Sequence, residues 1–298
     1  MISVIIDYLK MNDVEYRENY PMSRLSSVRI GNNASVVAYP KAEGELIELL
    51  NFLSECKFRH KIIGRMSNVL PSDEIYNGVL VKTDKFSKIE YSENIITAAA
   101  GASLIGLAFK TCDLGLSGLE ELSGIPGSLA GAIYGNAGAF GREISDLLMD
   151  VRVYDINRRC TEIISAQECR FGYRDSVFKG NNRIILSARL SLTADQPRNI
   201  RQNIEKYKKI RADTQPVGSY SLGSTFKRIN GSSAGALIDS CGLKGYKIGG
   251  AEISPIHAGF IVNSGEATAA DYLQLADYAA ERVNNAHGVR LEREIEVM

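Results

Sequence analysis

A glycine-rich segment is the part of the chain whose residue types and spacing point first to chemistry. Six glycines lie between Gly124 and Gly141 in "GIPGSLAGAIYGNAGAFG", and the run from Leu122 to Phe140 carries no charged residue. Backbone without side chains lets a flat ring or a pyrophosphate lie directly on the main chain. A glycine-proline turn that opens a helix also leaves N–H groups free for an anion. The segment therefore indicates a site for a phosphate or a flat ring.

Helix packing is the alternative interpretation of part of this segment. Gly127, Gly131 and Gly135 recur every four residues, so they would line one helical face that another backbone approaches. Pro126 would sit in the first turn of that helix, where its missing N–H costs nothing. Packing does not account for the glycines on either side, and the residues alone leave both interpretations open.

Composition excludes several classes of protein. The chain has 298 residues, enough for two or three domains, and 45% hydrophobic with 23% charged residues is usual for a globular protein. Its 35 Lys and Arg balance its 35 Asp and Glu, so no overall field favours nucleic acid or a membrane, and we expect neither as a partner. Five scattered cysteines without a CxxC pattern and three isolated histidines argue against a metal site.

The N-terminal segment mixes charges into its apolar residues, which indicates an amphipathic helix and not a signal peptide. An odd number of scattered cysteines fits a reducing compartment. We therefore expect a cytoplasmic protein, and a monomer.

The expected elements mix helices and strands without regular alternation, which indicates an α+β fold in several lobes. Helical spacing of apolar residues predicts a helix over 41–56, and a polar helix over 197–216 marks the best domain boundary. The Thr and Asp of "TAAD" have the spacing of a capping box, so a helix should begin near Thr268. Strands and hairpins are expected over 78–83, 88–101 and 146–156. Further strands are expected over 60–64, 182–192 and 288–298, with short ones within 246–263.

Segments along nearly the whole chain resemble the UDP-N-acetylenolpyruvoylglucosamine reductase family, in the same order. "SGIPGSLAGAIYGNAGAFGREISD" resembles its flavin-contacting segment, and "IIGRMSNVLPSDEIYNGVLVKT" resembles its pyrophosphate loop. "YRDSVFK", "GSTFK" and the terminal "LEREIEV" follow its other motifs. The resemblance implies a three-lobed FAD-binding fold of the vanillyl-alcohol-oxidase type with a C-terminal substrate lobe. The lobes would be 1–85, completed by strand 289–298, then 86–205 for FAD and 206–288 for the substrate.

The activity implied by the resemblance is a flavin-mediated reduction. NADPH would reduce FAD, and UDP-N-acetylglucosamine enolpyruvate would then be reduced to UDP-N-acetylmuramate for peptidoglycan synthesis. The alternatives are a divergent FAD-dependent oxidoreductase of the same fold acting on another substrate, and a non-catalytic paralogue that binds a flavin or a UDP-sugar.

The resemblance also assigns residues to the cofactor. Where the family shows three glycines, this chain has Gly64, Arg65 and Met66, and non-glycine residues would be strained if those positions need a positive φ. Arg65 would add a charge to the pyrophosphate. The implied FAD residues are Gly64, Arg65, Ser67, Asn68, Gly124, Pro126, Gly127, Ser128, Ala132, Asn136 and Gly138.

Three residues carry the implied reaction. Arg174 would hold the enolpyruvyl carboxylate, because a planar guanidinium suits a carboxylate. Ser224 would give a proton to the substrate carbon, and Glu294 would share a hydrogen with the developing enolate. Without the resemblance, Arg174 reads as a solvated loop arginine and Ser224 as a turn serine.

Substrate contacts are implied for Tyr173, Lys227 and Arg228. The family continues "FKNP" where this chain has Arg228 and Ile229 after Lys227, so this loop departs from the family pattern.

Overall fold

The computed structural model describes residues 2–229 and 233–298, so the expected lobes 1–85 and 206–288 each include residues outside the described part. The chain divides into two units, and each unit is assembled from three separate segments. The division into three lobes stays a prediction. Unit 1 comprises Met1–Glu18, Val36–Arg65 and Gly78–Ile210, and unit 2 comprises Asn19–Ser35, Met66–Asn77 and Arg211–Met298.

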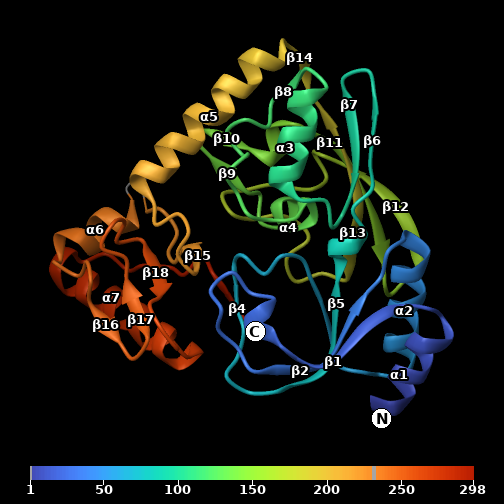
Figure 1. The fold of residues 1–298 in the computed structure, drawn as a ribbon, viewed down its shortest axis with the longest axis horizontal. Helices are drawn as coiled ribbons and strands as arrows, with labels where there is room; N and C mark the ends of the chain where they lie inside the picture. The colour runs from blue at the N-terminus through green and yellow to red at the C-terminus, as the bar shows by residue number, and fades with distance from the viewer. Residues whose placement is uncertain (1, 230–232) are drawn as a thin grey trace. The chain divides into compact units, whose positions relative to one another are not determined.

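Helices and strands are mixed along the chain, as expected (Figure 1). The helices are α1 (Ile2–Met11), η1 (Met22–Arg24), α2 (Glu43–Glu55), η2 (Thr83–Lys85), α3 (Leu104–Asp113), α4 (Leu129–Tyr134), η3 (Ile144–Asp146), α5 (Pro197–Thr214), α6 (Ala234–Ser240) and α7 (Ala269–His287). The first strands are β1 (Glu15–Pro21), β2 (Asn33–Tyr39), β3 (His60–Ile63), β4 (Val69–Leu70), β5 (Tyr76–Lys82), β6 (Ile89–Ser92), β7 (Ile95–Ala99), β8 (Leu116–Ser117), β9 (Gly138–Ala139) and β10 (Arg142–Glu143). They are followed by β11 (Leu148–Asp155), β12 (Cys160–Ser165), β13 (Arg183–Ser191), β14 (Thr193–Ala194), β15 (Ser221–Ser224), β16 (Lys247–Ile248), β17 (Ala251–Ile253), β18 (Phe260–Asn263) and β19 (Glu296–Val297).

The first sheet has the strand order β1-β2-β5-β3, with β3 parallel to β5. Helix α2 buries its leucine stripe in the same core as Val36 and Val79 of this sheet. Helix α1 lies beside α2, where Tyr8 stacks on Phe52 with ring centroids 3.8 Å apart (Figure 1). The predicted helix over 41–56 is confirmed, and Val81 of β5 belongs to the same core.

The second sheet is antiparallel, with the order β12-β11-β13-β7-β6. Helices α3 and α4 cover one of its faces, because Leu107 and Ile133 share a buried cluster with Val151 and Leu190 (Figure 1). Residues 88–101, expected to form strands and hairpins, form a hairpin of β6 and β7, and the chain turns at 93–94 between them.

Unit 2 contains an antiparallel sheet with the order β15-β18-β17-β16, packed with α6 and α7. Helix α7 begins at the predicted capping box: the Thr268 hydroxyl accepts from the Asp271 N–H and the Asp271 carboxylate accepts from the Thr268 N–H, both at 3.0 Å. The Asp73 carboxylate accepts from two more N–H groups of its first turn. The helix ends at Gly288, whose φ of 67° is the left-handed cap that favours glycine.

The C-terminal segment differs from its prediction. It does not form one strand over 288–298, because only β19 pairs regularly, in parallel with β4. Before β19, single backbone hydrogen bonds tie the segment to residues 225–227. Leu291 and Ile295 of this segment are buried.

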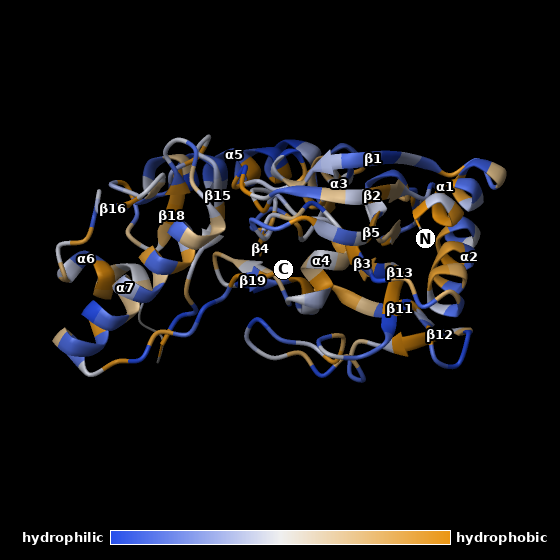
Figure 2. Cartoon of the chain, turned by 90° about the horizontal axis from the view of Figure 1, so that it is seen from below, coloured by the Kyte–Doolittle hydropathy of each residue, from blue (hydrophilic) through white to orange (hydrophobic). Residues whose placement is uncertain are grey.

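Helix α5 is coloured mostly hydrophilic in Figure 2, and only Ile200 and Ile204 of it are buried. Of the described helices, none is both long and apolar enough to cross a membrane.

Candidate active site

Two segments predicted to hold the cofactor meet in unit 1. A Cβ atom on Gly64 would lie 2.3 Å from the Ser128 hydroxyl oxygen, so only glycine fits beside that serine. Ser128 is fixed from the other side, since Ser103 and Ser128 form an isolated β-bridge and the Leu104 N–H donates to the Gly127 carbonyl at 3.0 Å. The residue after β3, Gly64, and the N-cap of α4, Ser128, therefore lie in direct contact and form one surface.

Gly101 makes a second close approach that sequence reasoning missed. A Cβ atom there would lie 1.8 Å from the Thr83 carbonyl oxygen, and its N–H donates to the Phe86 carbonyl at 2.9 Å. The available signal was a glycine that ends an apolar strand, which often marks a close backbone contact.

An ion pair between a buried lysine and a half-buried aspartate lies beside this surface and was also missed. The Lys82 ammonium donates to the Gly64 carbonyl at 2.8 Å and pairs with the Asp84 carboxylate at 2.8 Å. Burial lowers the pKa of Lys82, and the Asp84 carboxylate opposes that shift. The other Asp84 oxygen is buried and has no hydrogen-bond partner within residues 2–229 and 233–298.

Arg65 and Met66, which replace two glycines of the family loop, behave differently from each other. Met66 has a φ of 48° and its side chain is 3% exposed, so a bulky residue occupies the left-handed region here. Arg65 is exposed and is not among the described residues with a positive φ. The strain expected for non-glycine residues is therefore confined to Met66.

The glycine segment does not form the predicted packing helix. Helix α4 starts after its N-cap Ser128, whose hydroxyl accepts from the Gly131 N–H at 3.3 Å, and it ends at Gly135. Pro126 precedes the N-cap by two residues, so the prediction of a first-turn proline is wrong. Gly131 is exposed and only its own turn lies near it, so the helix-packing interpretation is wrong as well. Gly124 and Gly127 lie in the turn before α4, and Ala132 is buried in its core.

The surroundings of Gly138 explain why this position carries a glycine. A Cβ atom there would lie 2.9 Å from the Arg142 carbonyl oxygen and 3.5 Å from a guanidinium nitrogen of Arg174. Arg174 donates to the Gly138 carbonyl at 3.1 Å and to the Asn136 carbonyl at 3.4 Å. Sequence reasoning named all three of Arg174, Asn136 and Gly138, and the structure brings them together.

The Asn136 side chain is buried and satisfied by protein. Its amide donates to the Glu143 carboxylate at 2.7 Å and to the Gly172 carbonyl at 3.0 Å, and its oxygen accepts from the Ser145 N–H at 3.3 Å. Asn136 thus ties the glycine segment to the loop that carries Arg174.

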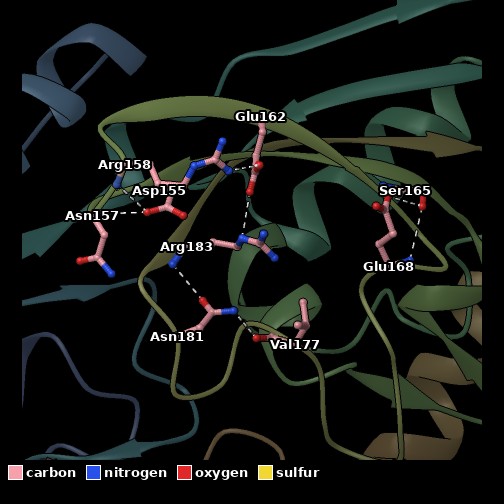
Figure 3. A network of polar contacts seen from close by, with 9 residues as sticks. All are labelled: Asp155, Asn157, Arg158, Glu162, Ser165, Glu168, Val177, Asn181 and Arg183. Carbon is pink, nitrogen blue, oxygen red and sulfur yellow. Dashed lines mark hydrogen bonds and ion pairs between the residues drawn. The ribbon is translucent and has the colours of Figure 1, made fainter.

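Figure 3 shows how that loop is anchored at its two ends. At one end the Glu168 carboxylate accepts from Ser165, and at the other the Asn181 amide donates to the Val177 carbonyl. Between the ends, the Val177 N–H donates to the Cys169 carbonyl at 2.9 Å. Arg174 itself has a φ of 55°, and its guanidinium lies 5.1 Å from the exposed Tyr173 ring. The anchors hold Arg174 in a conformation that is unusual for a residue with a side chain.

In unit 2, Ser224 ends β15 just after an irregularity of the sheet. Ser221 pairs with Val262 and Ser224 with Phe260, so the register shifts between them, and Gly223 has a φ of 78°. Such bulges redirect the side chain that follows. The Ser224 hydroxyl donates to the Phe226 carbonyl at 2.9 Å, which is the turn contact that its alternative interpretation expects.

Thr225 joins Ser224 to Glu294. The Glu294 N–H donates to the Thr225 carbonyl, and the Thr225 N–H donates to the Gly259 carbonyl, both at 2.8 Å. The Thr225 hydroxyl is 2.9 Å from the Tyr272 hydroxyl, and both residues are fully buried. Burial raises the Tyr272 pKa, so its hydroxyl stays neutral at any ordinary pH. The structure therefore places the backbones of Ser224 and Glu294 side by side around one fixed residue.

The remaining predicted residues of unit 2 have partners of their own. The Asn68 amide donates to the Glu294 carbonyl at 3.1 Å, and the Asn68 carbonyl accepts from the Glu296 N–H at 2.9 Å. Lys227 forms an ion pair with Glu292. Arg228 is exposed and Ser67 half-buried.

The predicted residues thus fall into two groups. Unit 1 holds Gly64, Arg65, Gly124, Pro126, Gly127, Ser128, Ala132, Asn136, Gly138, Tyr173 and Arg174, and unit 2 holds Ser67, Asn68, Ser224, Lys227, Arg228 and Glu294. Across residues 2–229 and 233–298 there is no group of three or more His, Cys, Asp or Glu side chains that would hold a metal ion.

Comparison with known proteins assigns this architecture to a class. A family model described as an FAD binding domain matches residues 34–159, which include Gly64 and Ser128. A second model, the C-terminal domain of UDP-N-acetylenolpyruvoylglucosamine reductase, matches residues 215–298, which include Ser224 and Glu294. The chain is thus a flavoprotein of mixed α+β structure with a distinct C-terminal domain.

Whole-chain relatives identify the family. The chain is 39% identical to a UDP-N-acetylenolpyruvoylglucosamine reductase of Caldicellulosiruptor bescii over 97% of this chain and 92% of that one. It is 40% identical to one from Caldanaerobacter subterraneus over 100% and 99%. The crystal structure of the corresponding enzyme from Thermus caldophilus is 31% identical, covers 95% of this chain and 98% of its own, and superposes with a TM-score of 0.80. The chain belongs to the UDP-N-acetylenolpyruvoylglucosamine reductase family.

The residues of unit 1 fit the FAD cofactor of this family. The Asp84 oxygen that is buried without a partner in the described chain is an acceptor suited to a ligand donor.

Proposed function

We propose that this chain reduces UDP-N-acetylglucosamine enolpyruvate to UDP-N-acetylmuramate with electrons from NADPH, as an FAD-dependent enzyme of peptidoglycan synthesis. The observation that carries the proposal is the match to reductases of this name over essentially the whole chain. Bound FAD would supply hydride chemistry, and the protein would supply binding, orientation and a proton.

The backbone surface formed by Gly64 and Ser128 is where the cofactor would bind, with Arg65 adding charge at the pyrophosphate. The glycines at 124 and 127, in the turn before α4, present backbone without side chains, which suits a close approach of backbone to ligand. Ser67, Asn68, Pro126 and Ala132 complete the proposed set, and Asn136 and Gly138 would act by holding Arg174.

Arg174 would bind the substrate carboxylate and stabilise the charge that develops next to it. Two backbone carbonyls already orient its guanidinium, so less side-chain freedom would be lost on binding. Tyr173, Lys227 and Arg228 would contact the rest of the substrate.

Ser224 would donate the proton to the substrate carbon. Its hydroxyl must rotate away from the Phe226 carbonyl to do so, which costs one neutral hydrogen bond, about 1 kcal/mol. Glu294 would share a hydrogen with the enolate from the neighbouring segment, where the Thr225 carbonyl holds its N–H.

We also propose that the protein works as a monomer in the cytoplasm, with small-molecule ligands as its partners. A formal net charge of zero and scattered cysteines support this assignment.

The direct test follows flavin absorbance under anaerobic conditions. NADPH should reduce the flavin of the purified protein and so lower its absorbance. UDP-N-acetylglucosamine enolpyruvate should reoxidise the flavin and restore the absorbance. A flavin that is reduced by NADPH but not reoxidised by this compound would favour a divergent substrate, for which Arg228 in the substrate loop is the motivating residue. A protein that binds no FAD would overturn the proposal.

A further inference from the structure

Lys82 is a buried cation that the proposed reaction does not use. It is the last residue of β5, and its side chain is 9% exposed. Its ammonium has two contacts, the Gly64 carbonyl and the Asp84 carboxylate, each at 2.8 Å. A charge is rarely buried unless it is paired and hydrogen-bonded, so the position of this ammonium is defined by Gly64 and Asp84 together.

The bond to the Gly64 carbonyl sets the direction of the next N–H group. No cis peptide bond occurs in the described chain, and in a trans peptide the C=O and the following N–H point in opposite directions. With the Gly64 carbonyl turned toward Lys82, the Arg65 N–H points away from Lys82. Over residues 2–229 and 233–298, nothing accepts a hydrogen bond from that N–H.

Two further observations show a cluster that is incomplete without a ligand. One oxygen of Asp84 is buried with no hydrogen-bond partner in the described chain, although buried acceptors are nearly always satisfied. The exposed Arg65 follows Gly64 directly in the chain, so a second cation lies at the same turn of backbone. A bound anion with neighbouring hydroxyl groups would satisfy both features.

We propose that Lys82 is a positioning residue for the pyrophosphate of FAD: its bond to the Gly64 carbonyl holds the Gly64–Arg65 peptide so that the Arg65 N–H faces the phosphates. The inference rests on the cofactor site proposed above between Gly64 and Ser128. In this chain two glycines of the family loop are replaced by Arg65 and Met66. Lys82, at the end of β5, fixes the Gly64–Arg65 peptide at the start of this loop.

The test measures binding to flavin-free protein, independent of turnover. FAD and riboflavin, which lacks the pyrophosphate, are titrated into wild type and variants, and dissociation constants are obtained from flavin fluorescence. Lys82→Met alone leaves the Asp84 charge unpaired and so risks the fold. The informative variants are therefore the neutral pairs Lys82→Met with Asp84→Leu, and Lys82→Gln with Asp84→Asn. Lys85→Met is the matched control, because Lys85 lies in the same η2 turn but pairs at the surface with Glu15.

We expect the neutral pairs to weaken FAD at least tenfold and riboflavin less than twofold, with Lys85→Met unchanged for both. Far-UV circular dichroism of each flavin-free variant confirms that it is folded. A folded neutral pair that binds FAD within twofold of wild type would overturn the inference, and so would equal losses for FAD and riboflavin. Failure of the proposed FAD site is distinguishable, because wild type itself would then bind neither flavin, and a different substrate would leave both dissociation constants unchanged.

Discussion

The three side chains proposed for the reaction are held to different degrees. Arg174 is fixed by two backbone carbonyls and by a loop anchored at both ends, which offsets the cost of its positive φ. Ser224 has a single hydroxyl bond, to the Phe226 carbonyl. The arginine is thus positioned in advance, and the serine is free to change its partner.

Replacing Ser224 by alanine should separate the two halves of the reaction. NADPH should reduce the flavin of Ser224→Ala at the wild-type rate, and reoxidation by substrate should slow by about 10²–10⁴-fold, the usual contribution of a positioned proton donor. Stopped-flow absorbance measures both rates. Ser221→Ala is the matched control on the same strand, because Ser221 offers Ser27 its carbonyl and not its hydroxyl. Reoxidation at the wild-type rate in Ser224→Ala would remove the serine from the proton transfer.

The hydrogen bond between the buried hydroxyls of Thr225 and Tyr272 should contribute to the folding stability of unit 2. Tyr272→Phe leaves the Thr225 hydroxyl buried without its partner, so the free energy of unfolding should fall by about 1–3 kcal/mol. In the double variant with Thr225→Val both hydroxyls are gone, and the loss should be smaller than the sum of the two single losses. Urea unfolding measures all four proteins; strictly additive losses would contradict the coupling.

At the residue scale, the sequence predicted those site residues that belong to a family motif or to a local spacing pattern. The Gly64, Arg174, Ser224 and Glu294 positions came from motifs. Lys82, Gly101 and Tyr272 did not, because their roles come from contacts with residues that are far away in the sequence or carry no motif. A lysine at the end of an apolar strand gives no sign that its ammonium reaches a carbonyl 18 residues earlier.

At the element scale, the periodic helices α2 and α7 and the cap of α7 were predictable, because hydrophobic spacing and capping are local. The C-terminal strand was overextended, because alternating side chains do not say how many residues have a pairing partner. Helix α4 is short for the glycine pattern that suggested it, because Ser128 starts it and Gly135 ends it.

Two glycines should respond to alanine in opposite directions. Gly44 lies inside α2 with nothing within 4 Å of its added Cβ, so Gly44→Ala should stabilise the protein by about 0.5–1 kcal/mol. Gly101→Ala would place a methyl group against the Thr83 carbonyl and should cost about 3 kcal/mol or more. Thermal unfolding of both variants checks this, and a neutral Gly101→Ala would show that the two backbones do not touch.

The N-terminal cap of α7 should make the folding stability of the protein depend on pH in the acid range. Hydrogen bonds from Thr268 lower the Asp271 pKa below its usual 3.8, so the charged form is favoured in the folded protein. This stabilisation is complete above about pH 4 and is lost as the pH falls through the folded pKa. Urea unfolding from pH 6 to pH 3 should show a steeper loss for wild type than for Asp271→Asn. Parallel profiles would contradict this cap.

At the scale of the whole molecule, each unit depends on segments that are far apart in the chain. The sequence suggested several lobes but not that unit 2 takes in 19–35 and 66–77, because nothing local marks a chain that leaves a unit and returns. β19 with β4 and Asp73 with the start of α7 are the contacts that unite these segments.

Removal of residues 289–298 should therefore disrupt all of unit 2. The deletion takes away β19, buried Leu291 and Ile295, and the backbone partners of residues 225–227. We expect loss of the near-UV circular dichroism signal and a lower melting temperature. A matched deletion of Ile2–Met11 removes a helix of comparable length that belongs to unit 1. A native-like spectrum without residues 289–298 would contradict the dependence.

This organisation also sets an order of events at the ribosome. Asn68 hydrogen-bonds to Glu294, which is synthesised 226 residues later. At a synthesis rate of ~5–20 residues per second, this separation corresponds to a delay of roughly 10–45 s. Until then the nascent chain carries Val28, Ile30 and Leu70 without the α7 core that buries them. Unit 1 lacks nothing beyond Ile210 and is able to fold while synthesis continues. Unit 2 becomes complete only once residues 289–298 have been synthesised, so its early segments expose apolar side chains for longest during synthesis.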